Sequence, residues 1–197
     1  MSEFLTYLEI GLWHVLDIGA YDHILFLMAL TIPYSFRDWR KILLLVTIFT
    51  VGHTLALLLS VFGILMIDAG VVEFLIPITI LATAVFNLFT AGKSARKDNM
   101  GVTGVITLFF GLIHGLGFSN YFKAILPGSA GDKVVPLFEF ALGIELAQIA
   151  VVLAVLMLSF IVQNFFRNPK RDFTLILSSI IIGIVLPMII ESEIWYK

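Results

Sequence analysis

Side chains that could bind a metal ion lie within long apolar stretches of this sequence. His114 is embedded in the glycine-rich run Phe110–Phe118, and no charged residue occurs within eight positions on either side of it. Other apolar runs contain the pair Asp22 and His23, then His53, then Glu145. Because ionisable groups are costly in lipid, we expect these side chains to face the protein interior. Histidine and carboxylate ligands without cysteine favour a borderline divalent metal such as Zn, Ni or Co.

The composition is that of an integral membrane protein. Of the 197 residues, 60% are hydrophobic and 13% are charged, which is more apolar surface than a soluble domain of this size could bury. The apolar runs are continuous and do not alternate with period two, which indicates helices and not a barrel. The net charge of -2 argues against nucleic acid as a partner. No long linker or repeat divides the chain, so we expect one polytopic domain over residues 1–197 in contact with the lipid bilayer.

Six apolar segments are long enough to cross a membrane, which requires about 20 helical residues. They cover residues 18–34, 39–63, 70–90, 101–122, 134–165 and 173–190. A shorter helix is expected over residues 4–16, at the membrane interface or entering it partway. The predicted fold is therefore all-α, with six transmembrane helices plus a short N-terminal interfacial helix.

The charges between these segments predict the orientation of the chain. The loops after the first, third and fifth segments are basic, whereas the other loops and both ends are acidic or mixed. Basic loops tend to stay on the cytoplasmic side of the membrane. This tendency predicts that both termini lie outside. In the fourth segment, Gly111 and Gly115 form a small-residue pattern that allows close helix packing, and this face could support a homo-oligomer.

Helix geometry places the polar residues at a similar depth in the predicted topology. With a rise of about 1.5 Å per residue, Asp22 and His23 lie roughly 6 to 8 Å below the outer surface. The same conversion gives about 15 Å for His53, about 12 Å for His114 and about 16 Å for Glu145. A single histidine in such a helix more often only bonds a neighbouring helix. Histidines that share a depth with carboxylates favour a common functional site.

Several further residues could support that site. His14 lies three residues before Asp17, and Glu145 lies three residues before Gln148, so each pair shares a helix face. Hydrogen bonds from neighbouring groups fix the orientation of metal-binding side chains. Asp17, Thr54 and Gln148 are the residues that we expect in this supporting role.

Three functions are compatible with such a site. A divalent-metal transporter would use the polar cluster in the outer half of the bundle. A zinc-dependent intramembrane hydrolase would use three histidines, an open position for water, and Glu145 or Asp22 as general base. A structural metal protein would instead require a closed site with four ligands. Residue spacing alone does not rank the first two functions.

Four ordered motifs resemble those of the HupE/UreJ family, and in particular its second branch. The first covers residues 11–30 with His14, Gly19, Asp22, His23 and Leu25-Phe26-Leu27. The others are Phe49-Thr50-x-x-His53-Thr54, Phe110-Gly111-Leu112-Ile113-His114-Gly115-Leu116-Gly117-Phe118 and Phe140-x-x-Gly143-Ile144-Glu145-x-x-Gln148. Together they span about three quarters of the chain, from Gly11 to Gln148.

The resemblance implies a multi-pass protein of the bacterial inner membrane, with relatives regarded as nickel or cobalt permeases. By motif, the metal-handling positions would be His14, Asp22, His23, His53, His114 and Glu145. The sequence departs from the nickel-permease pattern in two places. Seven residues separate His14 from Asp22, where those relatives have a shorter gap, and Phe110 stands where they carry a histidine. The resemblance favours transport of a divalent transition metal over hydrolysis.

Overall fold

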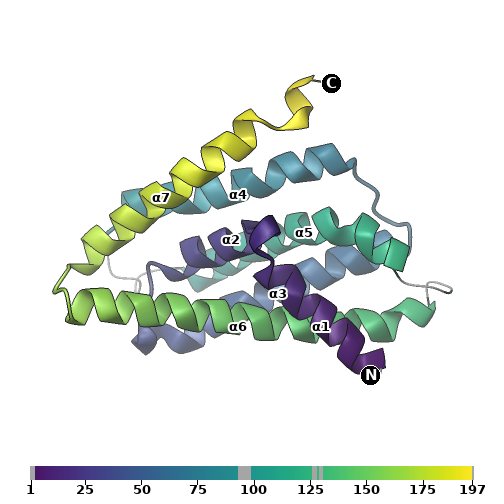
Figure 1. Cartoon of the computed structure of the whole chain (residues 1–197), viewed down its shortest axis with the longest axis horizontal. Coiled ribbons are helices and arrows are strands. Elements are labelled where there is room, and N and C mark those ends of the chain that lie inside the picture. Colours follow the sequence, from purple (N-terminus) through teal and green to yellow (C-terminus); the bar gives the residue numbers. More distant parts are fainter. Residues whose placement is uncertain (1–2, 93–98, 126–127, 129–130, 197) are drawn as a thin grey trace.

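The described part of the chain is helical in a computed structural model. It comprises residues 3–92, 99–125, 128 and 131–196, and it contains no β-strand. The basic cluster of residues 93–98, on which the orientation was partly predicted, lies outside the described residues. Seven α-helices form the described bundle (Figure 1): α1 Glu3–Leu16, α2 Asp22–Thr31, α3 Trp39–Val61, α4 Ala69–Thr90, α5 Met100–Ile125, α6 Val134–Asn164 and α7 Lys170–Ile190.

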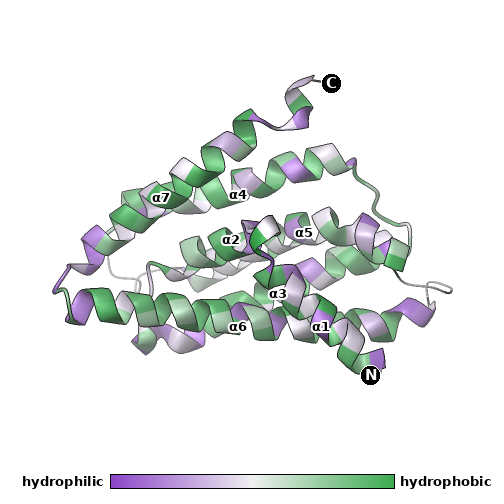
Figure 2. Cartoon of the chain, viewed as in Figure 1, coloured by the Kyte–Doolittle hydropathy of each residue, from purple (hydrophilic) through white to green (hydrophobic). Residues whose placement is uncertain are grey.

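Five of these helices are long and apolar enough to cross a membrane. They are α3, α4, α5, α6 and α7, and they correspond to the last five predicted segments. Hydrophobic residues predominate along them, whereas hydrophilic residues gather towards the helix ends (Figure 2). The described residues are therefore all-helical, as predicted, with five candidate membrane spans.

The first predicted crossing differs from the structure. In place of one helix over residues 18–34, the chain forms a short 3-10 turn, η1 (Ile18–Ala20), followed by the ten-residue helix α2. A helix of ten residues measures about 15 Å, roughly half of the hydrocarbon thickness. The break has a local cause, because the Asp17 side chain accepts a hydrogen bond from the Gly19 amide at 2.8 Å and caps the turn.

The N-terminal helix is part of the bundle. Gly11 of α1 and Gly143 of α6 bring the two backbones together. A Cβ atom at Gly11 would lie 2.2 Å from the Phe140 carbonyl oxygen, and one at Gly143 would lie 2.1 Å from that of Leu8. Along the bundle α1 is followed by α2, which runs on towards the opposite end of the molecule (Figure 1). Helix α1 therefore packs directly on α6, and its position at the interface or partway into the membrane stays a prediction.

Helices α3 and α5 are also joined through glycines. A Cβ atom at Gly52 would lie 2.4 Å from the Leu108 carbonyl oxygen, and one at Gly111 would lie 2.4 Å from that of Phe49. At Gly115 it would lie 2.3 Å from the His53 carbonyl oxygen. The Gly111 and Gly115 face, which we expected to be available for a homo-oligomer, is therefore filled by α3 of the same chain.

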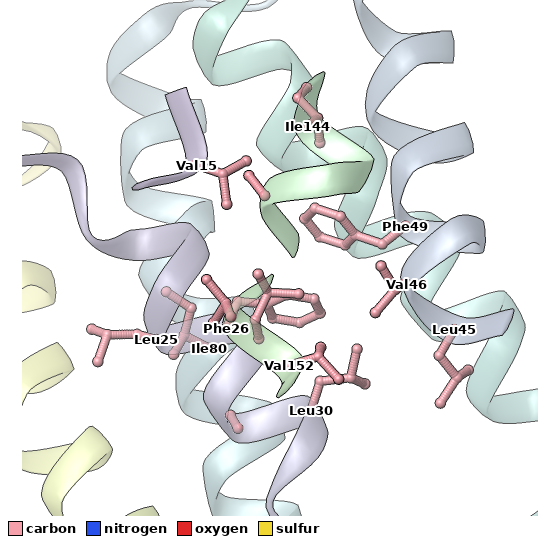
Figure 3. Close-up of a cluster of buried hydrophobic side chains, with 14 of the residues drawn as sticks. Val15, Leu25, Phe26, Leu30, Leu45, Val46, Phe49, Ile80, Ile144 and Val152 are labelled. Atoms are coloured by element: carbon pink, nitrogen blue, oxygen red, sulfur yellow. The ribbon is translucent and has the colours of Figure 1, made fainter. Parts of the chain in front are cut away.

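A common apolar core holds the short helices against the long ones. Val15 of α1, Phe26 of α2, Phe49 of α3, Ile80 of α4 and Ile144 of α6 lie in one cluster (Figure 3). All five side chains have no exposed surface. This core fixes α1 and α2 at the centre of the bundle, where both helices contribute polar side chains.

Candidate metal centre

The structure brings all four histidines of the chain together. They come from four helices: His14 from α1, His23 from α2, His53 from α3 and His114 from α5. The ring centroid of His23 lies 4.7 Å from that of His14, 5.5 Å from that of His53 and 5.1 Å from that of His114. His23, His53 and His114 are buried, with exposed fractions of 2%, 0% and 1%. We call these four residues the histidine cluster.

Two sets of ligand atoms in this cluster are close enough to hold an ion. In the first set, nitrogens of His14, His23 and His53 lie within 4.8 Å of one another. In the second set, a carboxylate oxygen of Asp22 and nitrogens of His23 and His114 do so. Three protein ligands with room for a further one suit a borderline divalent cation.

The ring nitrogens of the cluster lack other partners. Among the described residues, no hydrogen-bond partner is found for His14 Nε2, His23 Nε2, His114 Nδ1 or either ring nitrogen of His53. A buried polar atom without a partner is costly, and such atoms are rare in folded proteins. Such nitrogens, gathered in one cluster, fit a cation that accepts lone pairs from the imidazoles. The donor chemistry therefore agrees with the predicted divalent metal.

Two further ring nitrogens are held by polar neighbours. His23 Nδ1 lies 3.2 Å from Asp22 Oδ1, and His114 Nε2 lies 3.1 Å from the Thr79 hydroxyl of α4. Such contacts fix the tautomer and the orientation of a ligating imidazole. Thr79 was not predicted from the sequence, where nothing distinguishes it from other threonines of apolar helices. It is identified only by the packing of α4 on α5.

A Thr79→Val variant tests this contact. The change keeps the shape of the side chain but removes the hydroxyl at His114, so we expect metal affinity to fall roughly tenfold or more, as is usual for such supporting bonds. Equilibrium titration of the purified protein with Zn, Ni or Co measures the effect. Thr83→Val is the matched control, because the Thr83 hydroxyl donates to the Thr79 carbonyl of its own helix. Equal affinities for both variants would contradict the assigned role.

Glu145 and Gln148 occupy a separate polar group between α3 and α6. The Glu145 carboxylate accepts hydrogen bonds from Thr47, at 2.7 Å, and from Thr50. The Thr50 hydroxyl also lies 3.2 Å from Gln148 Oε1. Glu145 is absent from both sets of clustered ligand atoms among the described residues. The structure thus places it with two threonines and not with the histidines.

The two remaining predicted supporting residues have different surroundings. Asp17 is exposed and caps η1. Thr54 follows His53 in the chain. Its hydroxyl is buried, and no hydrogen-bond partner for it is found among the described residues. Aromatic rings lie close to the histidines, with Phe118 centred 3.9 Å from His14 and Phe49 centred 5.2 Å from His114.

A cavity of about 960 Å³ leads to the histidine cluster. It lies among α1, η1, α4 and α5, and His14, His23 and His114 form part of its wall. Four carboxylates line it, those of Glu9, Asp17, Asp22 and Glu73. None of the described lysines or arginines lines it. A cleft lined by one sign of charge concentrates ions of the opposite sign. The cavity therefore favours cations at the histidines.

Comparison with known proteins identifies the family of the chain. A family model described as HupE / UreJ protein matches residues 1–192. No curated protein and no solved structure matches the chain significantly. The family model covers nearly all of the sequence, including the helices that carry the four histidines and Asp22. The chain therefore belongs to the HupE/UreJ family.

Proposed function

We propose that this protein carries a divalent transition metal, Ni, Co or Zn, across the bacterial inner membrane. The observation that carries the proposal is the set of buried, unpartnered imidazole nitrogens at the end of an acid-lined cavity. Membership of the HupE/UreJ family, which is linked to nickel and cobalt transport, supports the same function. Imidazole ligands suit these metals, whereas Mg and Ca prefer sites made of oxygen ligands.

Six crossings with both termini outside suit this transport. In that arrangement, α1, η1 and α2 together form one broken crossing, and α3 to α7 form the other five. Both chain ends lie towards the right of Figure 1, whereas α6 and α7 join at the left end. That junction carries Arg167, Lys170 and Arg171, as expected for a cytoplasmic loop. A discontinuous helix at a midplane site is a recurrent feature of transporters.

The polar group around Glu145 offers the next step for the ion. Thr50 lies three residues before His53 on α3, so it is one helical turn away on the side of the basic loops. Thr47 lies one turn further, and both hydroxyls bond to the Glu145 carboxylate. We assign Glu145 the role of receiving the cation after it leaves the histidines.

A Glu145→Gln variant separates this role from that of a primary ligand. We expect metal affinity close to that of the wild type, but an initial transport rate lowered roughly tenfold, which corresponds to a barrier raised by about 1.4 kcal/mol. Titration measures the affinity, and uptake into proteoliposomes measures the rate. Glu139→Gln is the control, because it makes the same change earlier on α6. Loss of binding in Glu145→Gln would instead make Glu145 a ligand.

Uptake by proteoliposomes with a metal-sensitive dye inside tests the proposed function. The wild-type protein should accelerate the entry of at least one of Ni, Co and Zn, and His53→Ala should be as slow as protein-free vesicles. His53 is chosen because both of its ring nitrogens lack a partner among the described residues. Wild-type protein that binds metal but leaves all three entry rates at the level of empty vesicles would overturn the proposal.

A zinc-dependent intramembrane hydrolase is the second candidate function. The observation in its favour is the set of three histidines next to an open cavity, with the Asp22 carboxylate beside His23 as a possible general base. Glu145 suits that role less well, because Thr47 and Thr50 occupy its oxygens. Zinc that stays with the purified protein through exhaustive chelation, together with no metal uptake, would favour this function over transport.

A further inference from the structure

The two sets of metal ligands have only one residue in common. His14 and His53 complete the first set, Asp22 and His114 complete the second, and His23 belongs to both. His114 does not join His14 and His53 in a single set within the same limit of 4.8 Å. The histidine cluster is thus two overlapping sites and not one site with five ligands.

The two sites differ in their access to the cavity. Asp22, His23 and His114 all line the cavity wall, so an ion could reach this entry site directly. The other set includes His53, which has no exposed surface and does not line the cavity. We call it the buried site after His53, although its other two ligands, His14 and His23, line the cavity. It is also the site next to Thr50, the threonine that bonds to Glu145 one turn along α3.

The two sites also differ in charge. The entry site contains one carboxylate, whose negative charge attracts a hydrated cation and partly neutralises it. The buried site contains three imidazoles and no carboxylate, a ligand set that selects transition metals over Mg and Ca. A neutral imidazole has one nitrogen with a free lone pair, so His23 binds one ion at a time.

We propose that one divalent ion occupies these two sites in turn, first at Asp22, His23 and His114, then at His14, His23 and His53, with His23 as the ligand that both positions share. This inference rests on the proposed metal binding and adds the order of the two positions. The ion leaves the carboxylate at the cavity wall and enters an imidazole site whose third ligand, His53, has no exposed surface. No covalent bond is made or broken in this exchange of ligands.

Titration of the detergent-purified protein with Co²⁺ tests the two positions, because the visible spectrum of Co²⁺ reports its ligands. The wild type should bind one ion per chain. His114→Ala and His53→Ala should each still bind one ion, with affinity lowered less than about tenfold, since one complete site remains in each. Their spectra should differ from each other. The double variant should lose more than about 100-fold in affinity for Co²⁺, because neither site is then complete.

Loss of more than about 100-fold in either single variant would overturn the inference, since it would show one site that needs both residues. Asp22→Asn and His14→Gln repeat the test at a second ligand of each site, should a first variant fail to fold. Ser119→Ala and Ser60→Ala are controls on α5 and α3, at buried hydroxyls outside both sets. A wild type that binds no Co²⁺, Ni²⁺ or Zn²⁺ would instead overturn the proposed function itself.

Discussion

Replacing His23 by alanine is expected to abolish metal binding and metal transport together. His23 is the residue that the two sets of ligand atoms share, so its removal leaves two ligands in each. Two protein ligands are too few for a tight site of a borderline divalent ion, which usually has three or four. The expected loss of affinity exceeds that of any other single substitution in the cluster. Titration with Ni, Co and Zn and uptake into proteoliposomes measure the two effects.

Thr31→Val is the matched control for this variant. Thr31 lies on the same short helix, has no exposed surface, and belongs to neither set of ligands. Its substitution should leave metal affinity unchanged. If His23→Ala kept wild-type affinity, whatever its thermal stability, His23 would not be a ligand of either site. The overlapping sites would then be ruled out.

Alanine at Gly115 is expected to destabilise the bundle and to disturb the metal centre at the same time. The added Cβ would lie 2.3 Å from the His53 carbonyl oxygen and 2.9 Å from the Ala56 Cβ, so α3 and α5 must move apart. Overpacking of this kind typically costs about 1–3 kcal/mol. His53 and His114 lie on the two helices that separate, so metal affinity should fall as well. Thermal unfolding in detergent and metal titration measure these changes.

Gly183→Ala makes the same substitution where there is space. Gly183 lies within α7, and a Cβ atom there would meet nothing within 4 Å. Because alanine favours a helix over glycine, this change should leave stability equal or raise it by up to about 1 kcal/mol. If Gly115→Ala were as stable as Gly183→Ala, the close approach of α3 and α5 would not depend on Gly115.

The meeting of His23, His53 and His114 could be predicted from the sequence because depth in a membrane helix follows from residue count, whereas His14 was included only through the family motif. His53 and His114 lie in long, continuous helices, so the rise per residue placed them at a similar level. The same counting predicted five of the spanning helices. Whether these residues bind a metal stays a prediction, since side-chain proximity alone does not establish a ligand.

The sequence could not give the course of the first crossing or the role of Glu145. Residues 18–34 are apolar enough to predict one helix, but the Asp17 cap on Gly19 breaks it, and hydropathy does not detect a single capping bond. Glu145 shares the predicted depth of the histidines, yet the rotation of α6 directs it to Thr47 and Thr50. Depth fixes only the position of a residue along the membrane normal. The rotation of a helix about its own axis depends on contacts with its neighbours, such as those of Gly11 and Gly143.

X-ray absorption spectroscopy of the purified protein loaded with one equivalent of Ni, Co or Zn tests the central claim most directly. The account predicts a bound ion whose ligand shell contains imidazole nitrogens from two or three histidines, and loss of that signal in His23→Ala. A metal bound only by oxygen ligands, or no metal bound at any of the three titrations, would contradict it. The buried histidines would then serve only to hold the helices together.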